Sequence, residues 1–214
     1  MKNILVVTAV TVEQEAVLKG LNQQQGFEVI TAGVGPVAAA TGAATALAKG
    51  SYDLVLSMGI AGGFAERAPL GSVVLANQIV AADLGVLIQD SFQSIEELGF
   101  GTSRIEPALE LVARLKDSLD KTGQKTCVGP ILTLSTVTGT AEAALELLKR
   151  VPQAAAEAME GFGVAYAAHA QQIPVLEIRT ISNLVGPRDR ASWKIKEALE
   201  KLTEVAAQLP EVCR

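Results

Sequence analysis

Histidine and cysteine are scarce in this chain of 214 residues, which contains one histidine and two cysteines. Cys127 and Cys213 lie far apart in the sequence, and neither belongs to a CxxC pair. The lack of clustered ligands argues against a zinc site, so we expect no bound metal. Isolated cysteines are typical of a reducing compartment. We therefore expect a cytoplasmic protein whose thiols are inert packing or surface groups.

Long apolar runs and an excess of positive charge are absent as well. The amino-terminal segment MKNILVVTAV has an apolar run that Thr8 interrupts, which is too short for a secretory signal. No stretch approaches the roughly 20 apolar residues that a membrane-spanning helix requires. The formal net charge of -5 argues against nucleic acid or a membrane surface as the partner and favours a small molecule.

Strand and helix patterns alternate along the whole chain. A continuous apolar run predicts a strand at residues 4–8, and strand-like segments follow at 27–31, 54–57, 71–83, 125–137 and 174–181. Helical spacing predicts helices at residues 13–21, 36–49, 141–149 and 159–171, and a helix of about a dozen residues from Pro107. A final amphipathic helix carries its apolar side chains on one face, namely Trp193, Ile195, Leu199, Leu202 and Val205.

This alternation predicts an α/β fold in a single domain that covers residues 1–214. Hydrophobic residues make up 49% of the chain, which is enough to bury both faces of a sheet. We therefore expect a twisted, mostly parallel central sheet flanked by helices, with ligands at the carboxyl ends of the strands. Two segments break the pattern: a flexible run at Gly59–Gly63 and an irregular stretch at Gly85–Gly101.

One glycine pattern invites a different interpretation. Gly33, Gly35 and Ala38 follow a predicted strand with the spacing of a dinucleotide-binding turn, and Asp53 lies 20 residues further on. The acid that binds the ribose of a dinucleotide should end the second strand, whereas Asp53 precedes the apolar run at 54–56. We therefore expect a tight strand-to-helix turn there, and no nicotinamide, flavin or other cofactor.

Two short motifs indicate nucleoside chemistry. Met159-Glu160-Gly161 is followed twenty residues later by Arg179-Thr180-Ile181-Ser182-Asn183. The carboxylate of Glu160 can grip the two hydroxyls of a ribose, and the amide of Asn183 can bind the edge of a purine. A solvated glutamate and a loop-capping asparagine are the plain alternatives.

Three further segments join these motifs in a recognisable order: Ala9–Leu18, Gly33–Pro36 and Gly59–Gly63. With them the chain resembles the purine and uridine phosphorylase superfamily, particularly its nucleosidase branch. The resemblance runs nearly end to end. It implies a twisted central sheet flanked by helices, assembled as a homodimer or a higher homo-oligomer.

A nearer likeness rests on Ser182–Arg190 with Trp193, and on Phe92–Gly101. It is to members of the nucleosidase branch that act in menaquinone biosynthesis. Those enzymes hydrolyse an inosine derivative with a benzoate-bearing side chain and release hypoxanthine. The resemblance therefore implies an N-glycosyl hydrolase with a small-molecule nucleoside substrate.

The resemblance also implies which residue acts as the base. It places the family's catalytic glutamate at Glu13, which would accept a proton from the attacking water. Glu15 is a rival two residues on, and a solvated first-turn glutamate near the helix dipole is the plain alternative. Arg179 would hold the catalytic glutamate or the water, although an arginine at a strand end is often only a salt-bridge partner.

For the sugar, the resemblance implies contacts from the Met159-Glu160 motif. Glu160 would accept hydrogen bonds from the 2′- and 3′-hydroxyls of the ribose, and Met159 would supply an apolar surface beneath it. Related adenosine-type nucleosidases often carry another glutamate two residues before the ribose glutamate. Here that position is Ala158, which departs from their pattern.

Asn183 indicates which base is bound. Hypoxanthine presents two acceptors, O6 and N7, which an amide NH2 satisfies, whereas adenine presents a donor beside an acceptor. Adenine-specific nucleosidases of the superfamily have Asp at the matching position, so Asn183 predicts a 6-oxopurine. We expect Ser182 to orient Asn183, and the backbone of Val137 and the turn at Gly62 to contact the substrate.

Arg188 and Arg190 follow the base-reading segment directly. A guanidinium binds a carboxylate in bidentate fashion, so either arginine would suit the benzoate of the implied substrate. A helix entrance in which Asp189 pairs with a neighbouring arginine is equally compatible. We expect Phe92 and Phe100 to form an apolar lid or a subunit contact.

Water is expected as the nucleophile in place of phosphate. Phosphorylases of the superfamily hold phosphate with Arg and Gly-rich backbone near the first strand, and residues 8–18 contain no Arg or Lys. In the Gly-rich turn, Ile60 stands where related nucleosidases carry a Ser near the water. An adenine-type nucleosidase, an inosine phosphorylase and a non-catalytic nucleoside-binding protein stay open as alternatives.

Overall fold

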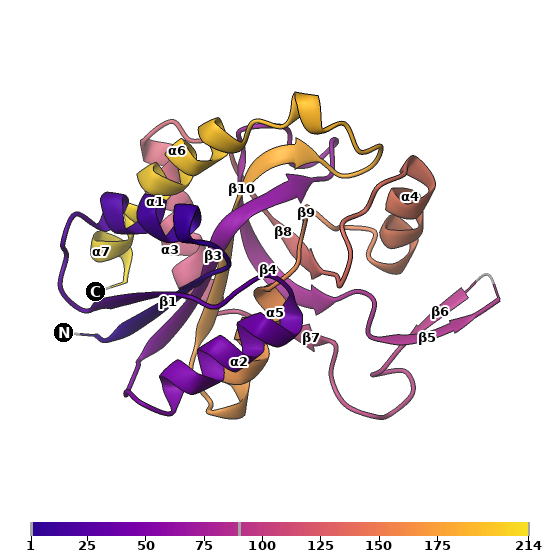
Figure 1. Ribbon diagram of the computed structural model, residues 1–214, viewed down its shortest axis with the longest axis horizontal. Helices are drawn as coiled ribbons and strands as arrows, with labels where there is room; N and C mark the ends of the chain where they lie inside the picture. Colours follow the sequence, from indigo (N-terminus) through magenta and orange to yellow (C-terminus); the bar gives the residue numbers. More distant parts are fainter. Residues whose placement is uncertain (1, 90, 214) are drawn as a thin grey trace.

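The computed structural model describes residues 2–89 and 91–213 and contains one large curled sheet with helices on both sides (Figure 1). Its strands are β1 (Ile4–Thr8), β2 (Phe27–Thr31), β3 (Leu54–Gly63), β4 (Val73–Ala81), β5 (Gly85–Ile88), β6 (Ser91–Ser94), β7 (Arg104–Ile105), β8 (Thr126–Thr133), β9 (Ala156–Ala158) and β10 (Val175–Leu184). Its helices are α1 (Thr11–Leu21), α2 (Pro36–Leu47), α3 (Leu109–Lys121), α4 (Ala141–Arg150), α5 (Gly161–Ala170), the 3-10 turn η1 (Arg190–Ser192), α6 (Ile195–Ala206) and α7 (Leu209–Val212). The predicted α/β class is confirmed.

The sheet runs in the order β10-β4-β8-β9-β3-β1-β2, with β7 paired to β4. Strand β10 pairs with both β3 and β4, so β3, β9, β8, β4 and β10 close into a ring from which β1 and β2 extend. In this sheet five pairings are parallel and three are antiparallel. The expectation of a mostly parallel sheet is thus confirmed.

Both faces of the sheet are covered, as the apolar strand sequences require. Side chains alternate along β1, so Ile4 and Val6 join the core beneath α1, α3, α6 and α7, while Leu5 and Val7 join the core beneath α2 and α5. Figure 1 shows α1 and α6 on one side of the sheet and α2 with α5 on the other. Pro36 occupies the first turn of α2, as its fixed φ favours.

The helix expected at residues 159–171 is present as α5 and begins at Gly161, two residues later than expected. The short strand β9, which lies between β3 and β8, was not expected. The Gly59–Gly63 run is not a flexible turn but the carboxyl-terminal half of β3. It pairs with β10, and its glycines leave room for side chains that cross it.

Two further expectations failed away from the sheet. Gly85–Gly101 is not irregular throughout, since β5 and β6 form an antiparallel hairpin that projects from the body of the molecule (Figure 1). Trp193 does not lie on the final amphipathic helix, because it precedes α6 in an extended conformation. Among the described residues, no helix is both long and apolar enough to cross a membrane.

Candidate active site

Glu13 lies where β1 ends and α1 begins, and backbone amides hold its carboxylate. Its Oε2 accepts hydrogen bonds from the N–H groups of Ala9 and Val10 at 3.0 and 3.3 Å, and its Oε1 accepts one from Ile60 at 2.9 Å. Glu13 is 3% exposed, whereas Glu15 is exposed to solvent. Of these two candidates, the structure brings only Glu13 into the site.

Burial sets the electrostatics of Glu13. Desolvation raises the pKa of its carboxyl, opposed by the charge of Arg179 and the hydrogen bonds from Ile60 and Ala9, while Glu160 adds a repulsion that raises it. The net direction is upward from the ordinary value of a glutamate. A carboxylate with a raised pKa is a stronger base, which suits proton abstraction from water.

Gly59 brings Glu13 and Arg179 together. A β-carbon on Gly59 would lie 2.5 Å from Oε1 of Glu13 and 2.8 Å from Nη1 of Arg179, so only glycine leaves space for both. Gly59 is also the residue that pairs with Arg179 across β3 and β10. The Gly-rich end of β3 therefore lets an acid and a guanidinium from different elements approach one another.

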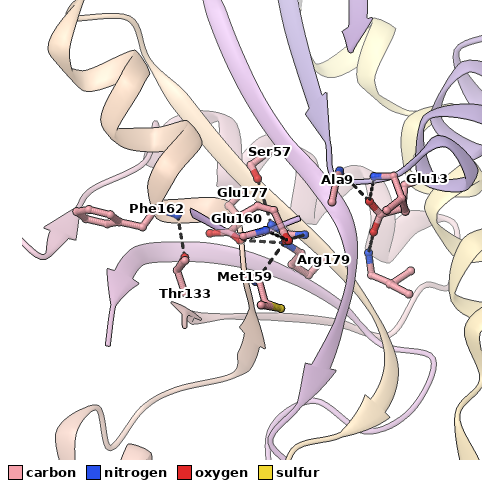
Figure 2. Close-up of polar contacts among 12 residues, drawn as sticks. Ala9, Glu13, Ser57, Thr133, Met159, Glu160, Phe162, Glu177 and Arg179 are labelled. Atoms are coloured by element: carbon pink, nitrogen blue, oxygen red, sulfur yellow. Dashed lines mark hydrogen bonds and ion pairs between the residues drawn. The ribbon is translucent and has the colours of Figure 1, made fainter. Parts of the chain in front are cut away.

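Arg179 lies at the centre of a cluster of polar side chains (Figure 2). It is 1% exposed, and its Nε donates to Oε1 of Glu177 at 2.9 Å and its Nη2 to Oγ of Ser57 at 3.2 Å. Its Nη1 lies 3.4 Å from Oε2 of Glu160. Ser57 and Glu177 were not among the expected site residues. A polar side chain within a buried strand is the signal that marks them, and in β10 this signal is weakened because other residues of the strand are polar as well.

Glu160 is fixed just before α5. Its Oε1 accepts from the N–H of Gly35 at 3.2 Å and its Oε2 from the N–H of Met159 at 3.2 Å. Gly35 has φ of 94°, a conformation that favours glycine, so the glycine turn after β2 serves to hold this carboxylate. Asp53 lies at the opposite end of the sheet, where its carboxylate accepts a hydrogen bond from the N–H of Asn3. This position agrees with the expectation that Asp53 binds no dinucleotide.

Asn183 lies near the end of β10 and pairs with Gly62 of β3. Its Oδ1 accepts from Oγ of Ser182 at 2.9 Å, and its Nδ2 donates to the carbonyl oxygen of Leu184 at 3.1 Å. A β-carbon on Gly62 would lie 3.1 Å from that Nδ2, so glycine gives the amide its room. Gly62 is three residues beyond Gly59 on β3, about 10 Å, which is a suitable span for a nucleoside between Glu13 and Asn183.

Val137 belongs to the loop after β8 and is 45% exposed. The next residue, Thr138, donates its N–H to Oε1 of Glu157 at 2.8 Å and its hydroxyl to Oε2. Glu157 pairs with Gly62 across β9 and β3, so this loop lies beside the Asn183 end of the site. Burial raises the pKa of Glu157, opposed by the bonds from Thr138. Glu157 was not among the expected site residues.

Arg188 and Arg190 are both exposed and flank one aromatic ring. Their guanidinium carbons lie 5.9 and 5.8 Å from the ring centroid of Trp193. Asp189 accepts from the N–H of Ala191 at 3.0 Å and forms no ion pair with an arginine in the described part of the chain. The alternative of an Asp189–Arg pair is therefore not what the structure shows.

Other reactive groups lie outside this cluster. Cys127 and Cys213 are free, and burial raises the pKa of both thiols, that of Cys213 to about 11, which disfavours a nucleophilic thiolate. No group of three His, Cys, Asp or Glu side chains in residues 2–89 and 91–213 is arranged to hold a metal ion.

Comparison with known proteins decides the family. The family model of the phosphorylase superfamily matches residues 23–214. Futalosine hydrolase from Streptomyces coelicolor is 46% identical over 98% of this chain and 96% of that protein, and futalosine hydrolase from Acidothermus cellulolyticus is 40% identical over 96% and 89%. The chain belongs to the futalosine hydrolase family. The expected superfamily and its nucleosidase branch are thereby confirmed.

A solved structure has the same fold as this member of the futalosine hydrolase family. The 5′-methylthioadenosine/S-adenosylhomocysteine nucleosidase from Neisseria meningitidis, in complex with methylthio-immucillin-A, matches with a TM-score of 0.86. The match covers 99% of both chains at 20% sequence identity. At that identity the likeness shows a common fold.

This futalosine hydrolase family member also has a large pocket away from the Arg179 cluster, between the β5–β6 hairpin and α4. It measures about 660 Å³ and is lined by Leu87, Phe92, Lys149 and Arg150, among others. Its cations already have partners, because Lys149 pairs with Glu146 and the guanidinium of Arg150 lies 4.2 Å above the ring of Phe92. Phe92 thus packs within the hairpin region, away from the Arg179 cluster.

Proposed function

We propose that the protein hydrolyses the N-glycosidic bond of futalosine, releasing hypoxanthine and dehypoxanthine futalosine as a step of menaquinone biosynthesis. Membership of the futalosine hydrolase family supports the reaction class. The single structural observation that carries the choice of base is the orientation of Asn183, whose side-chain oxygen is bonded within the protein while its NH2 lies above Gly62. One N–H of this NH2 is bonded to the carbonyl oxygen of Leu184, and the other can donate to an acceptor of hypoxanthine.

In the proposed reaction Glu13 accepts a proton from water as the water oxygen bonds to C1′ of the ribose. The C1′–N9 bond breaks, and its electron pair leaves with the base, which takes up a proton from solvent to become neutral hypoxanthine. Glu13 returns its proton to solvent. Glu160 accepts hydrogen bonds from the ribose hydroxyls, and the charge of Arg179 stabilises both carboxylates. Met159, half-buried beside Glu160, lies beneath the sugar.

Hydrolysis is favoured over phosphorolysis by the position of Glu13. Its carboxylate already accepts three backbone N–H groups at the end of β1 and in β3. Such donors would otherwise be available to an anion, and the negative charge of Glu13 repels phosphate. The region near β1 that binds phosphate in a phosphorylase is therefore better suited to a neutral water molecule in this protein.

Arg188 and Arg190 support a carboxylate-bearing substrate. Both are exposed, and both lie against Trp193 just beyond Asn183. A planar guanidinium forms two parallel bonds to a carboxylate, and the indole offers a surface for an aromatic ring. We place the benzoate of futalosine at this pair, with the backbone of Val137 beside the base.

We further propose that the enzyme works in the cytoplasm as a homodimer or a higher homo-oligomer. Exposed apolar side chains on the projecting hairpin support assembly, because Leu87 is 73% exposed and Val86 and Ile88 are also open to solvent. Phe100, 78% exposed, lies just beyond this hairpin. Analytical ultracentrifugation of the purified chain tests the oligomeric state.

The decisive experiment is to incubate the protein with futalosine, inosine and methylthioadenosine, with and without phosphate, and to identify the released base. The proposal expects hypoxanthine from futalosine at a rate independent of phosphate. Preferential release of adenine would favour an adenine-type nucleosidase, and a requirement for phosphate would favour a phosphorylase. Binding of a nucleoside without release of any base would indicate a non-catalytic binding protein.

A further inference from the structure

Glu177 is the most deeply buried acid of the cluster around Arg179. Its side chain is 0% exposed, and Oε1 accepts from Nε of Arg179 at 2.9 Å. Its Oε2 is buried and has no hydrogen-bond partner among the described residues. Both oxygens lie 2.1 Å from the place that a β-carbon on Gly161 would take, so the carboxyl group packs against the first residue of α5. A buried acid that is only half satisfied is costly, which argues for a functional reason to keep it.

The contacts of Arg179 suggest that reason. A guanidinium is planar, so fixing two of its nitrogens fixes the direction of the third. Nε is bonded to Glu177 and Nη2 to Ser57, both of which are buried behind the site. The remaining nitrogen, Nη1, then faces Oε2 of Glu160 (Figure 2). Nη1 and Oε1 of Glu13 lie 2.8 and 2.5 Å from the place that a β-carbon on Gly59 would take.

We propose that Glu177 is a positioning residue for hydrolysis. It fixes the plane of the Arg179 guanidinium so that Nη1 faces Glu160 and Glu13. This inference rests on the proposed function. Glu177 itself lies behind Arg179 and touches neither the water nor the ribose. Glu177 acts through its one hydrogen bond with Arg179. This bond requires an acceptor oxygen within hydrogen-bond distance of Nε.

The charges of the cluster agree with this role. Three carboxyl groups, those of Glu13, Glu160 and Glu177, surround one guanidinium, and full ionisation would leave a buried excess of negative charge. Burial raises the pKa of Glu177 to about 7, opposed by the charge and hydrogen bond of Arg179 and assisted by repulsion from Glu160. Ser57, which pairs with Glu177 across β3 and β10, and Gly161, which packs against its carboxyl group, are both uncharged. A protonated Glu177 still accepts from Nε through its carbonyl oxygen, and it leaves the charge of Arg179 to the two acids of the site.

Three substitutions separate position from charge. Glu177→Gln keeps the length and the acceptor oxygen but removes the charge, and we expect kcat/KM for futalosine within about threefold of the wild-type value at pH 7. Glu177→Asp keeps the charge but shortens the side chain, and Glu177→Leu removes the acceptor. For these two we expect kcat/KM to fall by roughly 100-fold through misplacement of Arg179. Hypoxanthine binding, measured by calorimetry, should change by less than about twofold in all three variants, since the base site at Asn183 lies elsewhere.

Rescue by Gln combined with loss in Asp is the expected pattern. If Gln loses as much activity as Leu, or if Asp retains full activity, the positioning role is wrong. A variant that unfolds is recognised by circular dichroism, and the proposal is then judged on a substrate-free measurement. In protein labelled with ¹³C at the glutamate carboxyls, the resonance absent from Glu177→Gln should titrate near pH 7, and a midpoint below about 5 would overturn the inference. If wild-type protein releases no base from futalosine, the proposed function is refuted. The titration then still tests separately whether the pKa of the buried Glu177 carboxyl is raised.

Discussion

The hydroxyl of Ser182 bonds to the side-chain oxygen of Asn183 across 2.9 Å, and this contact orients the amide. The amide nitrogen lies 3.1 Å from the carbonyl oxygen of Leu184, which can only accept, so the nitrogen must be the atom on that side. The one hydroxyl hydrogen of Ser182 then goes to Asn183, since its other acceptor, the carbonyl of Ala61, is farther away at 3.2 Å. One N–H of Asn183 is left, and in the proposed function it donates to an acceptor of the base.

Exchange of this amide for an acid should change the base that is cleaved. In Asn183→Asp we expect kcat/KM for futalosine to fall by roughly 10–100-fold, because a carboxylate beside O6 and N7 repels their lone pairs. Cleavage of methylthioadenosine should appear, since a carboxyl with a mobile proton matches adenine. Asn183→Ala serves as the control and should lose futalosine cleavage without gaining activity on methylthioadenosine. Unchanged kinetics on both substrates in Asn183→Asp would refute the assignment.

Two glutamates two residues apart provide a matched test of the base. Glu13→Gln should lower kcat for futalosine by about 10²–10⁴-fold while the affinity for hypoxanthine is kept, because proton transfer is lost and the base site is not touched. Glu15→Gln, an exposed neighbour, should behave as wild type. The raised pKa of Glu13 also predicts that the acidic limb of kcat against pH lies above the ordinary value of 4.5 and disappears in Glu13→Gln. Equal activity of the two variants would contradict the role of Glu13.

Gly62 should tolerate no side chain. In Gly62→Ala the new methyl group would lie 3.0 Å from Cγ2 of Val185 and 3.1 Å from Nδ2 of Asn183, so we expect KM for futalosine to rise by about tenfold or more. Gly139→Ala is the control, because its β-carbon would meet no atom within 4 Å. Steady-state kinetics and thermal unfolding of the two variants separate a local effect on the site from a general loss of stability. A Gly62→Ala enzyme with wild-type KM would show that the amide does not need this space.

The two arginines beside Trp193 should distinguish futalosine from inosine. Arg188→Ala and Arg190→Ala should each lower kcat/KM for futalosine by roughly 10–100-fold, the value of one hydrogen-bonded charge, and affect inosine much less. Lys196→Ala, an exposed cation on α6, is the control and should leave both substrates unaffected. Equal losses on futalosine and inosine would defeat the benzoate assignment.

The raised pKa of Glu177 predicts how stability depends on pH. A folded-state pKa of about 7 above an ordinary value of 4.5 means that this group's contribution is fully present below pH 4.5 and is lost as the pH rises through 7. Glu177→Gln cannot ionise and lacks this loss. The difference in free energy of unfolding between Glu177→Gln and the wild type should therefore rise by up to roughly 3 kcal/mol between pH 5 and 8. Denaturant titrations at each pH measure this difference. A difference that stays constant with pH would contradict the burial of an ionisable Glu177.

Much of the site could be predicted because its residues stand in local patterns. Glu160 follows Met159 in a short motif, and Arg179 and Asn183 belong to a second one. Ser57 and Glu177 carry a weaker signal, because each is a polar strand residue outside the two motifs, and they were not predicted. Glu177 and Arg179 stand two residues apart on β10 and hence on the same face, so their pairing is consistent with strand periodicity once the strand is known.

Local periodicity determined the α/β class and the main strands and helices, because apolar spacing acts within a few residues along the chain. The acid, amide and guanidinium groups were predicted from short motifs and from the resemblance to the superfamily that these motifs carry. Tertiary structure alone decided that β9 forms, that β10 closes the sheet between β3 and β4, and that Glu13 enters the site while Glu15 faces solvent. These outcomes depend on contacts between distant segments, such as the N–H of Ile60 on Glu13 and that of Gly35 on Glu160. Such contacts are favourable only when the whole core is packed, since burying each carboxylate must be offset by partners that the neighbouring sequence does not contain.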